Sequence, residues 1–358
     1  MSDDGLPCIL YGQLYTTYLS EEIESVLSRT KVSDPAIERS NDGDVIIPCS
    51  GETPEDIATA RCIRIKGILY GGDLNVLKPR QHDGVFLAFQ LNGRRRMDIA
   101  KIAVGKTIVH LHAPDLKHLR IWFPKSRLEE ERIARFLSLI NRRIELQNKI
   151  IEDLKRLKKR IADSLVRIIP NAFLRVQMRD ILNERSERNQ SNYPVFSVAV
   201  EAGVVDQIQH LGRSFAAKET SHYRVAYYGD VVYTKSPTGA YPFGIIKQSQ
   251  NNAPVALSPL YGVYSPSSFE IGYFLHCFFL NETNANNYLH PLVDRGAKNT
   301  MNITNQRFLD GCVPVPKTSA LQAIYGLLAS IENKLALNLK IRNAYQSQKT
   351  FLLKNLFI

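Results

Sequence analysis

The sequence predicts an α+β fold, in which two α+β domains are separated by a pair of long antiparallel coiled-coil helices, tandem-duplicated with pseudo-twofold symmetry. Three observations predict it: residues that recur about 190 positions apart, two long segments of helical periodicity, and β-rich runs with turn signals between them. The predicted parts are a first domain at 1–125, a central helix at 126–169, a second domain at 170–316 and a C-terminal helix at 317–358. A chain of 358 residues has room for about two domains.

The composition is that of a folded, water-soluble chain, with 44% hydrophobic and 23% charged residues. The longest uncharged apolar run, Ile271 to Leu280, is too short for a helix that crosses a bilayer, which takes about 20 residues. The first residues carry acid where a signal peptide carries base, so we expect no membrane contact and a cytoplasmic location. The five cysteines are scattered without a Cys-x-x-Cys pair, which indicates reduced thiols.

The formal net charge of +11 lies almost wholly in the two predicted helices. Residues 126–168 and 317–358 each carry five more basic than acidic side chains, whereas residues 1–125 are balanced. Such charge is usually that of the solvated flank of a coiled coil, and contact with a nucleic-acid backbone or an acidic protein face is the alternative. The sequence leaves these alternatives open.

The recurrence indicates a tandem duplication, because the offset changes by only a few residues over half the chain. The clearest matches between the two copies are at glycine and proline positions. The matched positions are Gly43-Asp44 with Gly229-Asp230, Gly105 with Gly296, and Pro124 with Pro316. We predict that Asp44 and Asp230 each form a turn into a strand.

Each long segment carries apolar residues at alternating spacings of three and four, which keeps one stripe on one face of a helix. The residues expected to pair the helices are Ile133, Leu137, Ile140, Ile144, Ile151, Leu154, Ile324, Leu328, Ile331 and Leu335. Packing of the stripes on the globular parts is the alternative. Four polar residues interrupt the stripes and are expected to fix the register: Gln147, Lys158, Asn338 and Lys349. The helices should be about 60 Å long.

Within the domains, Asp44 to Pro48, Asp230 to Tyr233 and Val255 to Tyr264 read as strands. Apolar spacing predicts helices at Leu19 to Ser28, Leu174 to Glu187 and Phe269 to Leu280. The first helix should end before Pro170, and the last should run almost to the end of the sequence.

Motifs of catalysis are absent from the sequence, which has no Walker lysine loop, Gly-x-Gly-x-x-Gly, His-Glu-x-x-His or Gly-x-Ser-x-Gly. His110 and His112 lack a third metal ligand, so we expect neither a metal site nor catalysis. Loops rich in arginine, lysine, asparagine and glycine suit contacts with base edges and phosphates. The candidate DNA-binding residues are Asn75, Arg94, Arg95, Arg96, Gly105, Lys106, Thr107, Arg295, Gly296, Lys298, Asn299, Thr300 and Gln306.

The order of domain, helix, domain and helix resembles the DNA specificity subunit of type I restriction–modification systems. The resemblance rests on residues 10–18 (Leu-Tyr-Gly-Gln-Leu-Tyr-Thr-Thr-Tyr), 43–45 with 50–53, 71–75 (Gly-Gly-Asp-Leu-Asn), 105–111 (Gly-Lys-Thr-Ile-Val-His-Leu) and 124–161. The second half repeats the scheme at 229–231, 265–266, 296–303 and from Pro316 onward. The first domain differs from the second in having a shorter segment before its Gly-Asp pair, so it is expected to be short at its N-terminal end.

The resemblance implies a non-catalytic subunit with two target-recognition domains, each reading one half of a bipartite double-stranded DNA target. It further implies that the helices space the domains and dock two modification subunits, which methylate adenine with S-adenosylmethionine, and that restriction (translocase) subunits join them. No cofactor is expected on this chain itself. A degenerate specificity subunit, or a coiled-coil adaptor without sequence-specific DNA binding, is the alternative.

Overall fold

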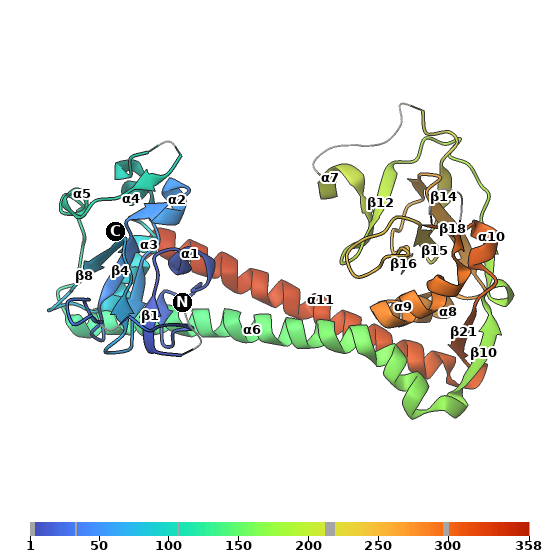
Figure 1. Cartoon of the computed structure of the whole chain (residues 1–358), viewed down its shortest axis with the longest axis horizontal. Coiled ribbons are helices and arrows are strands. Elements are labelled where there is room, and N and C mark those ends of the chain that lie inside the picture. Colours follow the sequence, from blue (N-terminus) through green and yellow to red (C-terminus); the bar gives the residue numbers. More distant parts are fainter. Residues whose placement is uncertain (1–3, 33, 106, 212–218, 296–300, 358) are drawn as a thin grey trace. The chain divides into compact units, whose positions relative to one another are not determined.

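The computed structural model describes residues 4–32, 34–105, 107–211, 219–295 and 301–357 (Figure 1). Its contacts divide the chain into two compact units. Unit 1 is Met1–Lys149 with Leu339–Ile358, and unit 2 is Ile150–Asn338. Each unit therefore contains one sheet-rich part and a portion of both long helices.

Unit 1 contains three sheets with the strand orders β3-β1-β7, β2-β6-β4-β8 and β5-β9. Short helices connect these strands. The strands are β1 Leu6–Ile9, β2 Glu22–Ile23, β3 Ser28–Thr30, β4 Val45–Pro48, β5 Ser50–Gly51, β6 Arg61–Ile63, β7 Leu69–Tyr70, β8 Leu74–Leu77 and β9 Val109–His110. The helices are α1 Gln13–Thr16, α2 Pro54–Ile57, α3 Gly84–Asn92, α4 Arg96–Ile102, α5 Ala113–Leu116 and the first part of α6 Arg127–Ile168.

Unit 2 contains sheets with the orders β11-β18-β15-β16, β13-β12-β17-β14, β10-β21 and β19-β20. Its strands are β10 Phe173–Gln177, β11 Leu182–Glu184, β12 Val195–Ala199, β13 Gly203–Asp206, β14 Arg224–Ala226, β15 Val231–Thr234, β16 Ile246–Gln248, β17 Val255–Leu257, β18 Tyr261–Pro266, β19 Asp294–Arg295, β20 Met301–Asn302 and β21 Cys312–Pro316. Its α-helices are α7 Gln207–Leu211, α8 Phe269–Phe278, α9 Glu282–Leu289, α10 Asn305–Phe308 and most of α11 Thr318–Asn355. Three short 3-10 helices are Pro170–Ala172, Met178–Asp180 and His290–Leu292.

The two units repeat one three-stranded arrangement, as the internal recurrence predicts. Strands β8, β4 and β6 are neighbours in unit 1, and β18, β15 and β16 are neighbours in the same order in unit 2, with all pairs antiparallel. Equivalent residues at the centre and on both sides are 186 or 187 positions apart. They are Val45 with its partners Cys62 and Leu77, and Val231 with its partners Gln248 and Tyr264.

The repeated Gly-Asp pair forms the turn that leads into the central strand of each arrangement. A carboxylate oxygen of Asp44 accepts the backbone N–H of Asn41 at 2.8 Å, and Asp230 accepts that of Tyr227 at the same distance. The glycine before each aspartate has a positive φ, +92° in unit 1 and +88° in unit 2, a conformation that L side chains rarely adopt. The predicted structural role of both aspartates is confirmed.

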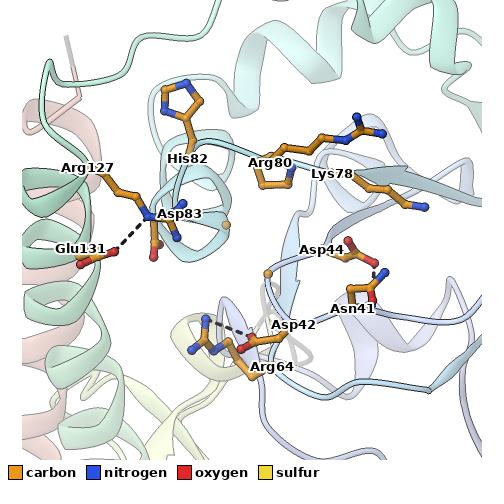
Figure 2. Close-up of a pocket in the computed structure, with 13 residues that line it drawn as sticks. Asn41, Asp42, Asp44, Arg64, Lys78, Arg80, His82, Asp83, Arg127 and Glu131 are labelled. Carbon is orange, nitrogen blue, oxygen red and sulfur yellow. Dashed lines mark hydrogen bonds and ion pairs between the residues drawn. The ribbon is translucent and has the colours of Figure 1, made fainter.

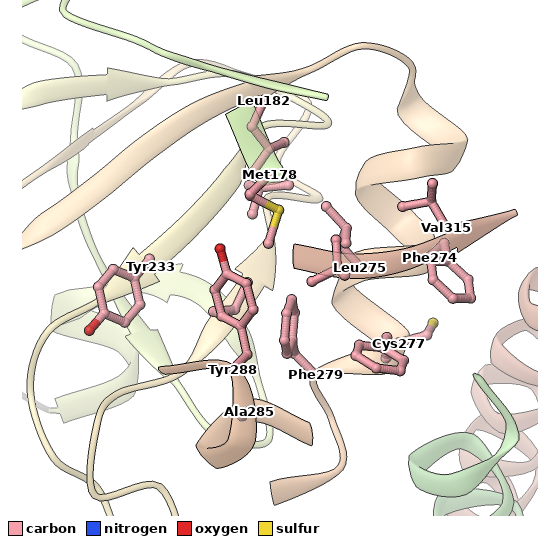
Figure 3. Close-up of a cluster of buried hydrophobic side chains, with 14 of the residues drawn as sticks. Met178, Leu182, Tyr233, Phe274, Leu275, Cys277, Phe279, Ala285, Tyr288 and Val315 are labelled. Atoms are coloured by element: carbon pink, nitrogen blue, oxygen red, sulfur yellow. The ribbon is translucent and has the colours of Figure 1, made fainter. Parts of the chain in front are cut away.

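The largest core lies in unit 2, where aromatic side chains of α8 and α9 pack on the sheet (Figure 3). Phe308 lies between two tyrosines, with ring centroids 4.7 Å from Tyr233 and 4.8 Å from Tyr264. The main core of unit 1 packs α3 against the sheet strand β4 and includes Phe86, Phe89 and residues of both long helices. These cores hold the loops in place.

Each unit pairs a portion of α6 with a portion of α11. In unit 1, Arg143 donates to the hydroxyl of Tyr345 at 2.8 Å, and in unit 2 Lys158 forms an ion pair with Glu332. Phe357, just beyond the end of α11, shares a core with Leu137, near the start of α6, so the two segments in unit 1 are antiparallel. The predicted antiparallel pairing is confirmed within the unit.

The apolar stripes also pack on the sheet-rich parts. The alternative prediction, that the stripes pack on the globular parts, is therefore correct for the N-terminal portion of each helix. Leu137 and Ile140 belong to the core of unit 1, and Ile324 and Leu328 belong to the core of unit 2. Burial continues along the stripes. Ile151, Ile331 and Leu335 are buried, whereas Ile133, Ile144 and Leu154 are half-buried.

Two predicted short helices are wrong, and the third is confirmed as α8. Residues 19–28 contain β2, which pairs with β6. Residues 174–187 contain most of β10 and all of β11, which pair with β21 and β18. Their apolar residues have helix-like spacing, but strand pairing determines the backbone conformation. Helix α6 ends before Pro170 and α11 reaches Asn355, as predicted.

Candidate nucleic-acid interface

Three consecutive arginines of unit 1 lie at the turn between α3 and α4. Arg95 donates to Asp98 at 3.1 Å, and Arg96 donates to the backbone oxygen of Glu55 at 3.1 Å. The side chain of Arg94 is exposed and makes no hydrogen bond or ion pair within the described ranges. Arg94 is therefore the arginine of this turn whose guanidinium is free to bind a phosphate or a guanine edge.

The loop before β9 is held in a conformation that requires glycine. Gly105 has φ +150°, and a Cβ atom there would lie 2.0 Å from the backbone oxygen of Ile108. Val104 and His110 exchange backbone hydrogen bonds of 2.9 and 2.8 Å across the base of this loop. Thr107 is exposed on it. Thr107 is thus an exposed polar side chain beside a glycine whose conformation is restricted, which suits contact with DNA.

Asn75 has a structural role, so the expectation that it reads bases does not fit its position. It lies in β8, is 6% exposed, and donates from Nδ2 to the backbone oxygen of Leu111 at 3.0 Å. The amide is therefore occupied in joining two segments of unit 1. A buried polar group of this kind stabilises the fold and is not available to a ligand.

In unit 2, Glu184 of β11 organises a polar network on the surface. Its carboxylate accepts hydrogen bonds from Asn305 at 2.7 Å, Gln306 at 2.9 Å and Arg224 at 2.6 Å. Partial burial acts to raise the pKa of Glu184, but these hydrogen bonds outweigh it and lower the pKa. The network brings Gln306, which the sequence predicts to bind DNA, together with Arg224 and Asn305.

Sequence reasoning missed Glu184, Arg224 and Asn305. The first two lie on strands that are 40 residues apart, and no spacing in the sequence links them. Asn305 adjoins Gln306 and carries the same amide group, which is the one signal that could have been used.

A second surface cluster lies beside the Gly-Asp turn of unit 2. Arg185 donates to both carboxylate oxygens of Asp230, at 2.8 and 3.0 Å, and its guanidinium lies 4.8 Å from the ring centroid of Tyr227. Tyr228 is 51% exposed. Arginine and tyrosine side chains on a fixed turn offer both hydrogen bonds and stacking to a nucleic acid.

Several candidates from the sequence cannot be placed. Lys106, Gly296, Lys298, Asn299 and Thr300 lie outside the described residues, and for Arg295 only the backbone, in β19, is described.

The polar residues that interrupt the helical stripes have defined partners in two cases. Lys349 donates to Glu21 at 2.8 Å, and Asn141 donates to the same carboxylate oxygen at 2.7 Å. In unit 2, Lys158 of α6 pairs with Glu332 of α11. The first contact joins a long helix to the sheet-rich part of unit 1, and the second joins the two helices, so both fix register.

The other two interruptions have no partner across the helix pair among the described residues. Asn338 donates to the backbone oxygen of Lys334, in its own helix, at 2.7 Å. The side-chain oxygen of Gln147 is buried without a hydrogen-bond partner.

A cavity of about 740 Å³ opens beside the Gly-Asp turn of unit 1 (Figure 2). Cations line it, but most have an acidic neighbour. Arg64 pairs with Asp42 at 3.3 Å and Arg127 with Glu131 at 3.1 Å. The charge of this cavity is therefore largely balanced, and it does not indicate a site for a polyanion.

Groups of three or more side chains able to hold a metal ion are absent from the described residues. Likewise, none of the helices described here has a stretch of the length and apolar character needed to span a membrane.

Two sheet-rich units built on one plan, each containing portions of two long antiparallel helices, define the class of fold. The predicted resemblance to type I specificity subunits is confirmed by the comparisons. The S subunit of a type I restriction–modification system from M. genitalium matches 99% of this chain and 92% of its own, with a TM-score of 0.56 and 19% identity. The HsdS subunit from Thermoanaerobacter tengcongensis matches 90% of this chain and 82% of its own, with a TM-score of 0.45 and 15% identity.

In sequence, a Mycoplasma pneumoniae protein that is named as a type I specificity subunit is 30% identical over 114 residues, which is 32% of this chain. The match spans about 30% of that relative's length. No family model matches the sequence.

Proposed function

We propose that this chain is a non-catalytic DNA sequence-recognition subunit of a type I restriction–modification complex. Each sheet-rich unit would read one half of a bipartite double-stranded DNA target. The observation that carries the proposal is the repeated strand arrangement with its Gly-Asp turn, because two copies of one binding module suit two half-sites.

The DNA contacts would come from polar groups at the surface of the sheet-rich parts. In unit 1 these are Arg94 and the loop of Gly105 and Thr107. In unit 2 they are Arg224 and Gln306, which Glu184 orients. Arginine and amide side chains can read guanine and adenine edges through paired hydrogen bonds. Lys106, Arg295, Gly296, Lys298, Asn299 and Thr300 remain proposed contacts on the strength of their sequence alone.

The outer faces of the long helices would dock the modification subunits. In unit 1, Phe136, Leu139 and Leu146 of α6 are 47 to 57% exposed and lie three and seven residues apart. In unit 2, Leu327 and Leu337 of α11 are exposed as well. Exposed apolar residues at helical spacing are typical of a surface that a partner helix covers.

The partner subunits would then carry out the catalysis. Two modification subunits would bind S-adenosylmethionine and methylate adenine, restriction (translocase) subunits would complete the complex, and this chain would hold no cofactor. The assembly would act in the cytoplasm, where its DNA substrate lies.

A degenerate specificity subunit or coiled-coil adaptor is the second candidate. One observation bears on it: β21 pairs with β10, whereas residues 120–124 pair with no strand within the described residues.

Selection of DNA from a random duplex pool by the chain bound to a modification subunit separates the two candidates. A specificity subunit should enrich one split motif and bind it about 10³-fold or more tightly than random duplex at physiological salt. An adaptor should show no enrichment while it still co-purifies with the modification subunit.

A further inference from the structure

The guanidinium of Arg224, in the polar network of unit 2, is held on one side only. Its Nη1 atom donates to a carboxylate oxygen of Glu184 at 2.6 Å and to the backbone oxygen of Arg185 at 2.9 Å. Its Nε and Nη2 atoms make no hydrogen bond to any residue that the structure describes, and both keep contact with solvent. These two atoms form one edge of the planar group and carry two parallel N–H donors. Arg224 therefore presents a pair of donors in a defined direction.

The amide of Gln306 is oriented by the same carboxylate. Gln306 is exposed, and its Nε2 atom donates to the second oxygen of Glu184 at 2.9 Å. An ionised carboxylate can only accept hydrogen bonds, so the amide cannot turn over without losing this bond, and its oxygen is directed away from Glu184. Gln306 thus offers a hydrogen-bond acceptor close to the two donors of Arg224.

Glu184 is itself held in place by its surroundings. It lies in β11, which pairs with β18, and its side chain is 19% exposed. Asn305 donates at 2.7 Å to the carboxylate oxygen that Arg224 also uses, and the hydroxyl of Tyr264 donates to the backbone oxygen of Asn305 at 3.2 Å. Side chains that are positioned before a ligand arrives lose less conformational entropy on binding. Glu184 therefore prepares Arg224 and Gln306 for a ligand.

Two parallel donors with an acceptor beside them match one kind of base pair. In the major groove a G·C pair presents two acceptors, N7 and O6 of guanine, followed by a donor, the N4 amine of cytosine. An A·T pair presents the N6 amine of adenine at the second position, where it would meet a donor of Arg224. The arrangement of Arg224 and Gln306 therefore suits a G·C pair and opposes an A·T pair.

A DNA phosphate also accepts two parallel N–H donors, but the charge of Glu184 disfavours it here. Partial burial acts to raise the pKa of Glu184, yet the hydrogen bonds that it accepts outweigh burial and lower the pKa, so the carboxylate stays ionised. A phosphate on the free edge of Arg224 would lie close to this like charge, whereas a guanine edge carries no net charge. Lys235 is a better phosphate ligand. It lies near enough for Arg224 to lower its pKa further than burial does, and its amine has no hydrogen bond or ion pair among the described residues.

We propose that Arg224 and Gln306, both positioned by Glu184, read one G·C base pair in the half-site that unit 2 binds. Arg224 donates from Nε and Nη2 to O6 and N7 of the guanine, and Gln306 accepts from the N4 amine of the cytosine. Glu184 touches no base and is a positioning residue. This assignment rests on the proposed function, and it adds which base pair is read and through which atoms.

Atom-specific changes in the DNA test the assignment with the full chain bound to a modification subunit. Selection from random duplex first gives the motif, and each guanine of the motif is then replaced by 7-deazaguanine, which lacks the N7 acceptor. At one guanine of one half-site the native complex should bind about tenfold more weakly. The complex with Arg224→Lys, which keeps the charge but lacks the paired donors, should be insensitive to that replacement.

The outcomes separate the two levels of the account. A motif in which Arg224→Lys responds to 7-deazaguanine as the native chain does, at every guanine, overturns the base-pair assignment alone. A native chain that selects no motif overturns the proposed function, and the assignment with it.

Two further variants test the positioning role and provide the matched control. Glu184→Gln should lower the preference for G·C at the same position and leave the other half-site unchanged, whereas a general loss of stability would weaken binding at every position. Lys235→Met removes a neighbouring charge, so it should weaken binding to all duplexes alike and keep the preference. Relaxation of the same position by Lys235→Met would contradict the assignment. So would Arg224→Met if it reduced the salt slope by about 0.9 and kept the motif, because the free edge would then bind a phosphate.

Discussion

The Nζ atom of Lys349 lies 2.8 Å from a carboxylate oxygen of Glu21, which is 3% exposed. Lys349 interrupts the apolar stripe of the C-terminal helix, and Glu21 immediately precedes β2. Asn141 of α6 donates to the same oxygen. One buried carboxylate thus joins both long helices to the sheet-rich part of unit 1, and it explains why a lysine is found in the stripe.

Replacing Lys349 alone should destabilise unit 1. Lys349→Met leaves the Glu21 carboxylate buried with a weakened set of partners, which costs about 3–5 kcal/mol in systems of this kind. The double variant Glu21→Gln, Lys349→Met should recover much of that loss, because no unpaired charge remains. Chemical denaturation of both variants measures the difference. Lys340→Met, an exposed site on the same helix, is the control and should change little.

The contribution of the Glu21–Lys349 pair to the stability of the fold should disappear in acid. Burial acts to raise the pKa of Glu21, but Lys349, Arg61 and Asn141 outweigh burial and lower it. A lowered folded-state pKa stabilises the fold above the unfolded value of about 4.3, and the stabilisation disappears as the pH falls through the folded value. The stability difference between the native chain and the double variant should therefore shrink below about pH 4. A difference that does not change with pH would contradict the lowered pKa of Glu21 in the folded protein.

Lys247 should make unit 2 more stable as the pH rises above 8. It is 3% exposed, and burial, reinforced by Lys158, lowers its pKa to about 8. Since the unfolded chain binds this proton up to about pH 10.4, unfolding becomes less favourable between these two values. Lys247→Met should remove the rise. The difference in unfolding free energy between the two proteins is measured at pH 7 and at pH 9.5, so that the titration of other groups cancels. An equal difference at both pH values would contradict the assignment.

Two neighbouring leucines of α6 should behave in opposite ways. Leu137 is fully buried and Leu139 is 50% exposed. Leu137→Ala should cost about 2–5 kcal/mol of unfolding free energy, whereas Leu139→Ala should stay within about 0.5 kcal/mol. If the outer face docks a modification subunit, Leu139→Asp should weaken co-purification with it while the melting temperature is kept. Retention of the partner by Leu139→Asp would place the docking surface elsewhere.

Arg94→Ala should reduce DNA affinity through the loss of one phosphate contact. The slope of log affinity against log salt should fall by about 0.9. Arg95→Ala, in which the lost guanidinium is already paired with Asp98, should change the slope less. Titrations of labelled duplex at several salt concentrations measure both. An unchanged slope for Arg94→Ala would remove this turn from the interface.

The fold could be predicted from the sequence wherever a pattern repeats over a long distance. The helical stripes, the ends of α6 and α11, and the Gly-Asp turns all follow from spacing or from the restricted backbone of glycine and proline. Short elements such as β2 and β10 could not be predicted, because pairing with strands far along the chain determines their conformation.

The candidate site was predictable only in its residue types. The sequence indicates arginine and amide groups, but not that Asn75 is buried against Leu111 or that Glu184 gathers Arg224 and Gln306. These outcomes depend on which strands become neighbours, which residue spacing does not encode. Gly105 is the exception, since its conformation explains the glycine directly.

Mapping of methylated adenine in cells tests the central claim most directly. Cells would produce this chain with a cognate modification subunit, beside cells that lack the chain, and co-purification would confirm the complex. The account predicts chain-dependent methyladenine in both halves of one split motif. Complex formation without any chain-dependent motif would contradict it and support the adaptor.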